Sequence, residues 1–139
     1  FNQELGNSLD NLTQLTTLDM GQNYNKPFGN SLKKLQNLTS FTLSYDYNHP
    51  IDDAFDGLVS LRYLSFGNKF NKTINNSLNN LTNIRIIHFS DYFNQSLGNS
   101  LKSLVNLEVL EFGNNPLLGC FNQLLANSLS CCSAYPRLL

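Results

Sequence analysis

The chain has 139 residues, of which 41% are hydrophobic, and this suits a single domain with an apolar core. Its formal net charge of −1 excludes a general electrostatic attraction to nucleic acid or to an anionic membrane surface. No apolar run reaches the roughly 18 residues of a membrane-spanning helix, so no membrane span is expected.

A 23-residue unit repeats five times along the chain without an inserted or deleted residue. The copies span residues 1–23, 24–46, 47–69, 70–92 and 93–115, and the last copy reads FNQSLGNSLKSLVNLEVLEFGNN. A fixed period between about 20 and 50 residues is typical of a solenoid, in which each unit packs against its neighbours. The chain begins in phase with the repeat and without Met, so we expect it to be a piece of a longer array.

Seven positions of the unit are apolar in every copy, namely positions 1, 5, 9, 12, 15, 18 and 20, counted from the first Phe or Tyr. Positions 18 and 20 alternate with polar neighbours, which predicts a short strand with one buried face. The residues at position 18 should therefore lie side by side on adjacent parallel strands. They are Leu18, Phe41, Leu64, Ile87 and Leu110.

Positions 9, 12 and 15 predict a short 3₁₀ or α-helical return, because residues three apart lie on one side of such a turn. A serine precedes this segment in four copies and is the predicted N-cap. These serines are Ser8, Ser31, Ser77 and Ser100. Each unit is thus expected to be a strand, a turn, a helical return and a second turn. The predicted fold class is an α/β solenoid with a parallel sheet.

Asn occupies position 2 in all five copies and is the one polar residue that never varies. The five residues are Asn2, Asn25, Asn48, Asn71 and Asn94. They lie between apolar rows, where an unpaired amide would be costly. We therefore predict a buried asparagine ladder, in which the amides bond to turn backbone or to each other.

The pattern of residues 1–115 resembles the leucine-rich repeat, and within that superfamily it is similar to the FNIP-type repeat. The resemblance is carried by Phe70-Asn71, Phe93-Asn94-Gln95, Tyr24, Tyr47, Pro27, Pro50, Phe66-Gly67 and Phe112-Gly113. It implies a right-handed coil with the sheet on the inner face and short 3₁₀ or α-helical returns on the outer face. FNIP-type arrays occur in proteins of social amoebae and giant viruses, often behind an F-box. The resemblance therefore implies the substrate-recognition arm of a larger F-box-type protein.

Residues 116–139 depart from the period. The motif FNQLLANSL restarts the pattern at Phe121, but the expected strand does not follow. This segment is interpreted as a partial sixth repeat that forms a C-terminal cap, with a degenerate tail as the alternative. All three cysteines lie here. Cys120 could pair with Cys131 or Cys132 outside the cytosol, and free thiols are the expectation inside it.

The sequence shows no dinucleotide-binding, P-loop, zinc-protease or paired-cysteine motif. We therefore expect neither an enzyme, nor a cofactor, nor a small-molecule substrate. Asp52, Asp53 and Asp56 are interpreted as a solvated turn and not as a cation site, because calcium loops need more oxygen ligands at set spacing. His49 and His88 lie at different positions of different units, and no metal site is expected. Basic residues do not cluster as nucleic-acid binding would require.

Positions 16, 17 and 19 should point away from the core and form the exposed face of the sheet. They vary between copies while the apolar rows do not, which is what a recognition surface needs. The candidate partner-binding residues are a basic and aromatic middle with acidic flanks. They are Arg62, Tyr63, Arg85, His88, Glu108, Glu111 and Asp19.

The resulting hypothesis is a non-enzymatic scaffold that binds another protein through this face. A secreted or cell-surface recognition module with glycosylated repeats is the alternative, since N-x-S/T sequons occur throughout the array. They begin at Asn11, Asn37, Asn71, Asn75, Asn80 and Asn94. A structural array without a specific ligand is a further possibility. A cytoplasmic location is favoured and an extracellular one stays open.

Overall fold

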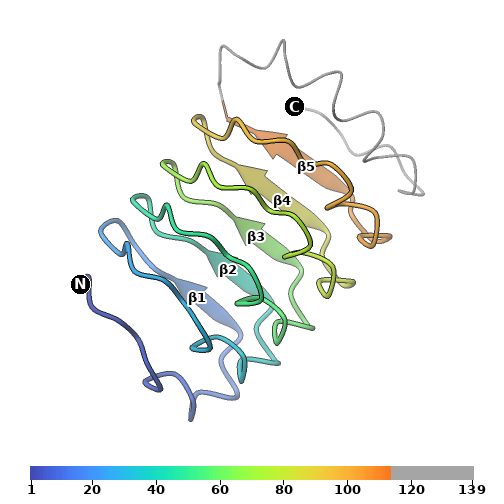
Figure 1. Ribbon diagram of the computed structural model, residues 1–139. Helices are drawn as coiled ribbons and strands as arrows, with labels where there is room; N and C mark the ends of the chain where they lie inside the picture. The colour runs from blue at the N-terminus through green and yellow to red at the C-terminus, as the bar shows by residue number, and fades with distance from the viewer. Residues whose placement is uncertain (114–139) are drawn as a thin grey trace.

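Residues 1–113, which the computed structural model describes, form a solenoid with a single parallel sheet of five strands (Figure 1). The strands are β1 (Thr17–Asp19), β2 (Ser40–Thr42), β3 (Tyr63–Ser65), β4 (Ile86–Phe89) and β5 (Val109–Phe112). Each repeat is one coil, numbered 1 to 5 from the N-terminus. The strand order in the sheet is the order in the sequence. The predicted cap at residues 116–139 lies outside the described residues.

The register of the sheet confirms the predicted alignment of position 18. Leu18 pairs with Phe41, Phe41 with Leu64, Leu64 with Ile87, and Ile87 with Leu110. Each pairing joins residues one repeat length apart, so every coil repeats the path of the coil before it. The solenoid and its period are therefore as the apolar rows predicted.

The predicted helical returns are wrong: residues 1–113 contain no helix, so this part of the chain is a β-solenoid and not an α/β fold. The returns are built from separate turns. In every coil the N–H groups of positions 8, 10, 12 and 15 donate to the carbonyls of positions 5, 7, 9 and 12. A 3₁₀ helix needs such bonds from consecutive residues, and here they start at every second or third residue. The three-residue spacing therefore marks closed turns.

The predicted N-cap role of the serines at position 8 fails with the helices. Ser31, Ser77 and Ser100 are instead buried within the returns. The Ser100 hydroxyl donates to the carbonyl of Asn75 in the preceding coil, and Ser8 only closes a turn through its backbone N–H. Serine at this position is thus buried in coils 2, 4 and 5, and in coil 5 its hydroxyl links two coils.

Position 6 has a positive φ in all five coils. The residues are Gly6, Gly29, Asp52, Asn75 and Gly98, with φ between 44° and 51°. This left-handed region is costly for most L-residues but accessible to Gly, and less so to Asn and Asp. The restricted choice at position 6 is therefore a backbone requirement of the turn that closes between positions 5 and 8.

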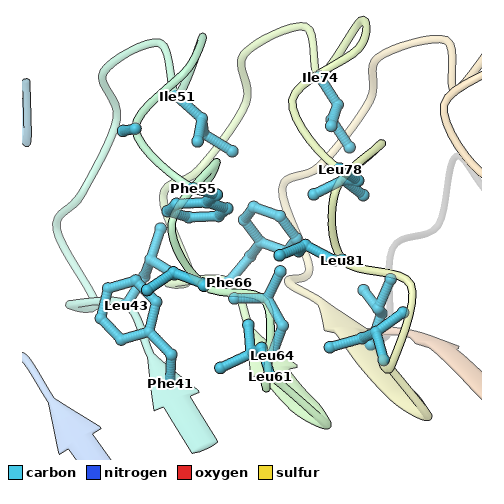
Figure 2. Packing of buried hydrophobic residues seen from close by; sticks show 14 of the residues in the cluster. Phe41, Leu43, Ile51, Phe55, Leu61, Leu64, Phe66, Ile74, Leu78 and Leu81 are labelled. Atoms are coloured by element: carbon cyan, nitrogen blue, oxygen red, sulfur yellow. The ribbon is translucent and has the colours of Figure 1, made fainter. Parts of the chain in front are cut away.

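The apolar rows fuse into one core between the sheet and the returns (Figure 2). In the interior coils the side chains are almost completely buried, as Figure 2 shows for Phe41, Phe55, Leu64, Phe66 and Leu81. The rings at position 1 form a second continuous feature, with centroids 6.0–6.4 Å apart and nearly parallel planes. The repeat length therefore places like side chains on like side chains along the whole solenoid.

The asparagine ladder at position 2 is present and has one consistent geometry. Each side-chain oxygen accepts a hydrogen bond from the backbone N–H of the Asn at position 2 of the next coil, at 2.8–3.0 Å. The prediction that these residues are buried is wrong, because Asn2 and Asn94 are exposed and the other three are partly exposed. The ladder lies at the surface of the turn, where it holds neighbouring coils in register.

A second set of amides joins the coils at position 14. The side-chain NH₂ groups of Asn37, Asn83 and Asn106 donate to the position-13 carbonyls of the preceding coils, at 2.8–2.9 Å. The sequence analysis missed this set because position 14 also holds Gln14 and Ser60. Two rows of asparagine, at positions 2 and 14 of the repeat, thus link successive coils.

Asn48→Ala should lower the free energy of unfolding by about 1–2 kcal/mol, because the N–H of Asn71 loses its acceptor. Asn79→Ala is the matched control, since Asn79 is exposed and its side chain bonds no described residue. Urea denaturation of both variants checks this. Equal effects at the two positions would contradict a stabilising role for the ladder.

Alkaline pH should destabilise the protein through two tyrosines in the column of rings. Burial raises the pKa of Tyr24, with Glu4 adding to the effect, and burial raises the pKa of Tyr47 still further. The unfolded chain therefore loses these protons above about pH 10 while the folded chain keeps them, so stability is intact below pH 10 and falls as pH rises.

Replacing both residues, Tyr24→Phe and Tyr47→Phe, should reduce this alkaline loss of stability, by about 1 kcal/mol at pH 11 for Tyr47. Phe70 and Phe93 show that the column accepts Phe. Urea unfolding at pH 8 and pH 11 measures the difference. An identical pH dependence in the double variant and the parent would refute the assignment.

Candidate functional site

The solvent side of the sheet carries positions 17 and 19, which alternate with position 18, buried on β2 to β5 and partly buried on β1. Position 16 lies just before each strand, and its backbone hydrogen bonds continue those of the sheet from one coil to the next. The N–H of Arg62 donates to Thr39, that of Arg85 to Arg62 and that of Glu108 to Arg85, at 2.8–2.9 Å. Three rows of side chains, each with one residue from every coil, therefore face outward.

Most of the predicted binding residues gather over β3, β4 and β5. His88 is the centre of one group: its Nε2 lies 2.8 Å from Oε2 of Glu111, and its Nδ1 lies 3.4 Å from the hydroxyl of Tyr63. The Tyr63 and His88 rings meet edge to face with centroids 5.2 Å apart. The three side chains therefore hold one another across three adjacent strands.

Arg85 and Glu108 form an ion pair on the position-16 row, in which both side chains are more than half exposed. Such a pair contributes little to stability because water and salt screen it. Arg62 lies beside it on the same row and forms no ion pair with any residue between 1 and 113. The row thus offers one cation that no described carboxylate neutralises.

Asp19 does not belong to this group. It lies on β1, three strands away from β4, and its Oδ1 accepts a hydrogen bond from the N–H of Gly21 at 2.8 Å. This local bond stabilises the turn that follows β1. Asp19 therefore stabilises a turn, and it does not lie beside the other predicted binding residues.

The register adds two residues that the sequence analysis left out. On the position-17 row Ile86 lies next to Tyr63 and Val109 lies next to Ile86, and both are partly exposed. This apolar row runs between the two charged rows. We call the eight residues over β3 to β5 the sheet patch. They are Arg62, Tyr63, Arg85, Ile86, His88, Glu108, Val109 and Glu111.

Spacing in the sequence could have found the pairings within the sheet patch. Arg85 and Glu108 are one repeat length apart, and so are His88 and Glu111. In a solenoid of this period, residues at that separation are direct neighbours on adjacent strands. Complementary side chains one period apart are therefore a usable signal for ion pairs between coils.

The acidic turn at Asp52, Asp53 and Asp56 lines a shallow concavity with Asn75 and Asn76. Two of its three carboxylates are already engaged: the Lys33 ammonium lies 3.2 Å from Asp53 and lowers its pKa, and the Asn80 amide donates to Asp56 at 2.9 Å. Within residues 1–113 no three acidic, His or Cys side chains are placed to hold a metal ion.

No protein-family model matches the chain, and a search of curated proteins finds no significant match. Among residues 1–113, no helix is long and apolar enough to span a membrane. The case for a function therefore depends on the geometry of the sheet patch.

The ion pair between Arg85 and Glu108 should couple by less than about 1 kcal/mol in a double-mutant cycle of the two alanine variants. The coupling should shrink at about 1 M NaCl, because the pair is exposed and salt screens it. Ile87→Ala, on the core side of β4, should lower the free energy of unfolding by about 2–5 kcal/mol because Ile87 is fully buried. Urea unfolding measures all four variants. A salt-resistant coupling above that range would mean that the charged rows serve stability.

Proposed function

We propose that the protein is a non-enzymatic interaction module that binds another protein through the sheet patch. The observation that carries the proposal is the apolar row of Tyr63, Ile86 and Val109 between two charged rows. Protein interfaces commonly combine an apolar centre with a polar rim, and Tyr and Arg are frequent anchors within them.

The support beneath the patch favours a preorganised surface. Leu64, Ile87 and Leu110 lie under its three strands and are completely buried. The contacts of His88 with Tyr63 and Glu111 restrict the outward side chains as well. A surface that is already ordered loses less conformational entropy on binding, which favours affinity.

The charge distribution indicates the chemistry of the partner. Arg62 has no ion-pair partner in the described chain, so a carboxylate of the partner would find an available guanidinium there. Glu108, just before β5, and Glu111, on β5, would face basic or neutral groups. The expected partner surface is therefore apolar in its middle and acidic on the side that meets β3.

The proposal extends to the repeat family of the solenoid and its place in a larger protein. We infer that it is a right-handed coil of the leucine-rich-repeat superfamily with FNIP-type units, and that it serves as the substrate-recognition arm of a larger F-box-type protein. The seven apolar rows and the asparagine at position 2 support this assignment. The sheet patch would then be the surface that selects the substrate.

The test is a pull-down from a lysate of the source organism with three forms of the full chain. The first is the parent, and the second carries Arg62→Glu and Arg85→Glu. The control carries Lys72→Glu and Lys102→Glu, which change the net charge equally but lie outside the sheet face. We expect partners that the parent and control retain to fall at least about tenfold with the sheet-patch variant, as for loss of interface anchors.

Quantitative mass spectrometry of the retained proteins gives the readout. Urea unfolding of the three forms ensures that any loss of binding does not reflect unfolding. If the sheet-patch variant retains the same partners in the same amounts as the parent, the sheet patch is not the binding surface.

A further inference from the structure

Two tyrosines on the turns that follow the strands are largely exposed, and neither belongs to the sheet patch. The side chain of Tyr45 is 47% exposed and that of Tyr92 is 62% exposed, whereas Tyr24 and Tyr47 are fully buried. The turns that carry them stack along one side of the solenoid, beyond the ends of the strands (Figure 1). The two residues therefore offer aromatic surface outside both the core and the sheet face.

The path of the chain fixes how far apart the two tyrosines lie. Tyr45 is position 22 of coil 2, and its carbonyl accepts the N–H of Lys69, position 23 of coil 3, at 2.9 Å. Positions 22 and 23 of successive coils are thus neighbours, and Tyr92 is position 23 of coil 4. Because adjacent strands are about 4.8 Å apart, the two tyrosines are separated by two coils, or about 9.6 Å, along the solenoid axis.

Lys69 occupies the coil between the two tyrosines and is held by its neighbours. Its ammonium lies 2.8 Å from Oδ1 of Asp46 and 5.9 Å from the centre of the Tyr45 ring. The hydrogen bond to Asp46 raises the pKa of Lys69, and Tyr45 and Tyr92 add to the effect, so both tyrosines are close to the ammonium. The Asn68 amide donates to the Tyr45 hydroxyl at 3.2 Å. We call these five residues the turn patch, and its two opposite charges are paired with each other.

We propose that the turn patch binds a proline-rich segment of another protein in the polyproline II conformation. This helix has three residues per turn and a rise of about 3.1 Å per residue, so side chains three apart recur on one face at about 9.3 Å. The tyrosines are separated by nearly the same distance, about 9.6 Å along the axis. Tyr45 and Tyr92 can therefore each pack against one proline of a P-x-x-P segment that runs along the solenoid.

The spacing distinguishes this conformation from the other regular ones. Neighbouring residues on one face of an extended strand are about 6.6 Å apart, and one turn of an α-helix advances about 5.4 Å. Neither repeat matches the separation of the two rings.

The polar groups of the turn patch suit the same ligand. A polyproline II segment makes no internal hydrogen bonds, so its carbonyls are free to accept bonds from a partner. The Lys69 ammonium lies between the two rings and can donate to such a carbonyl while it keeps its contact with Asp46. Because the charges of the patch are already paired, the ligand needs no charged side chain.

The test is an NMR titration of the full chain with a twelve-residue alanine peptide that carries four prolines, one at every third residue. We expect saturable shifts of the amides of Tyr45, Lys69 and Tyr92. The control peptide has the same composition with its prolines at every second residue, so that no two of them are three apart. It should bind at least about tenfold more weakly. Equal binding of the two peptides, or no shifts at the turn patch, would overturn the proposal.

Two double variants test the anchors. Tyr45→Ser with Tyr92→Ser should raise the dissociation constant of the first peptide at least about tenfold, as for loss of interface anchors. The matched control, Val59→Ser with Val105→Ser, also removes two exposed apolar side chains two coils apart, and it should leave the constant unchanged. Urea unfolding verifies that both variants are folded. Equal losses of affinity in the two would count against the turn patch.

An exchange of two side chains tests the spacing itself. Lys69→Tyr with Tyr92→Lys keeps composition and net charge but moves the second ring to the coil next to Tyr45, about 4.8 Å away along the axis. Affinity for the peptide should fall about tenfold, as when an anchor is lost. If this variant binds as tightly as the parent, the separation of the rings does not select the ligand and the proposal fails.

Other occupants and the sheet patch are tested in the same way. A soluble cello-oligosaccharide that shifts the turn-patch amides where the peptide does not would overturn the proposal, because the rings would then bind a saccharide. Self-association of the parent in sedimentation, abolished by Tyr45→Ser with Tyr92→Ser, would also overturn it. The variant with Arg62→Glu and Arg85→Glu should bind the peptide like the parent, since the turn patch does not depend on the sheet patch. Loss of peptide binding in that variant would place the site on the sheet face and refute the proposal.

Discussion

The equal length of the coils is the constraint on which this structure depends. The side-chain oxygen of Asn25 reaches the N–H of Asn48, and the same bond recurs one repeat length later along the array. Backbone bonds from position 16, the column of rings and the apolar rows all use that separation. One additional residue in a single coil would shift these sets together, because they share one path.

This regularity separates the core from the surface. The residues that set the register lie at positions 1, 2, 5, 9, 12, 15, 16, 18 and 20. At positions 17 and 19 the side chains of Tyr63, His88 and Glu111 contact one another on the sheet face, and at position 16 the bond that recurs between all coils is a backbone bond. Tyr63, Ile86 and His88 can therefore differ from Thr17, Ser40 and Asp19 without disturbing the coils. A variable surface over an invariant core follows from the geometry.

Local periodicity misled the interpretation of the returns. Residues three apart share a side in a 3₁₀ turn, but isolated turns and a continuous helix give the same spacing. The hydrogen bonds distinguish them, because within residues 1–113 they start at every second or third residue of each return and not at consecutive residues. Position 6, just before the returns, adds a turn with a left-handed residue. The occurrence of only Gly, Asp and Asn there was visible in the sequence and would have indicated a turn. At position 21 the reason for Gly67 was not visible: a Cβ there would lie 1.6 Å from the carbonyl oxygen of Ser44 in the preceding coil.

Periodicity in the chain was enough to predict the parallel strands, their register, the buried rows and the identity of most outward residues, because each of these depends on separation along the sequence. The surface position of the asparagine ladder and the separate role of Asp19 required the folded molecule. They depend on how far one coil is displaced from the next and on which atoms that displacement brings into contact, and a repeat length specifies neither.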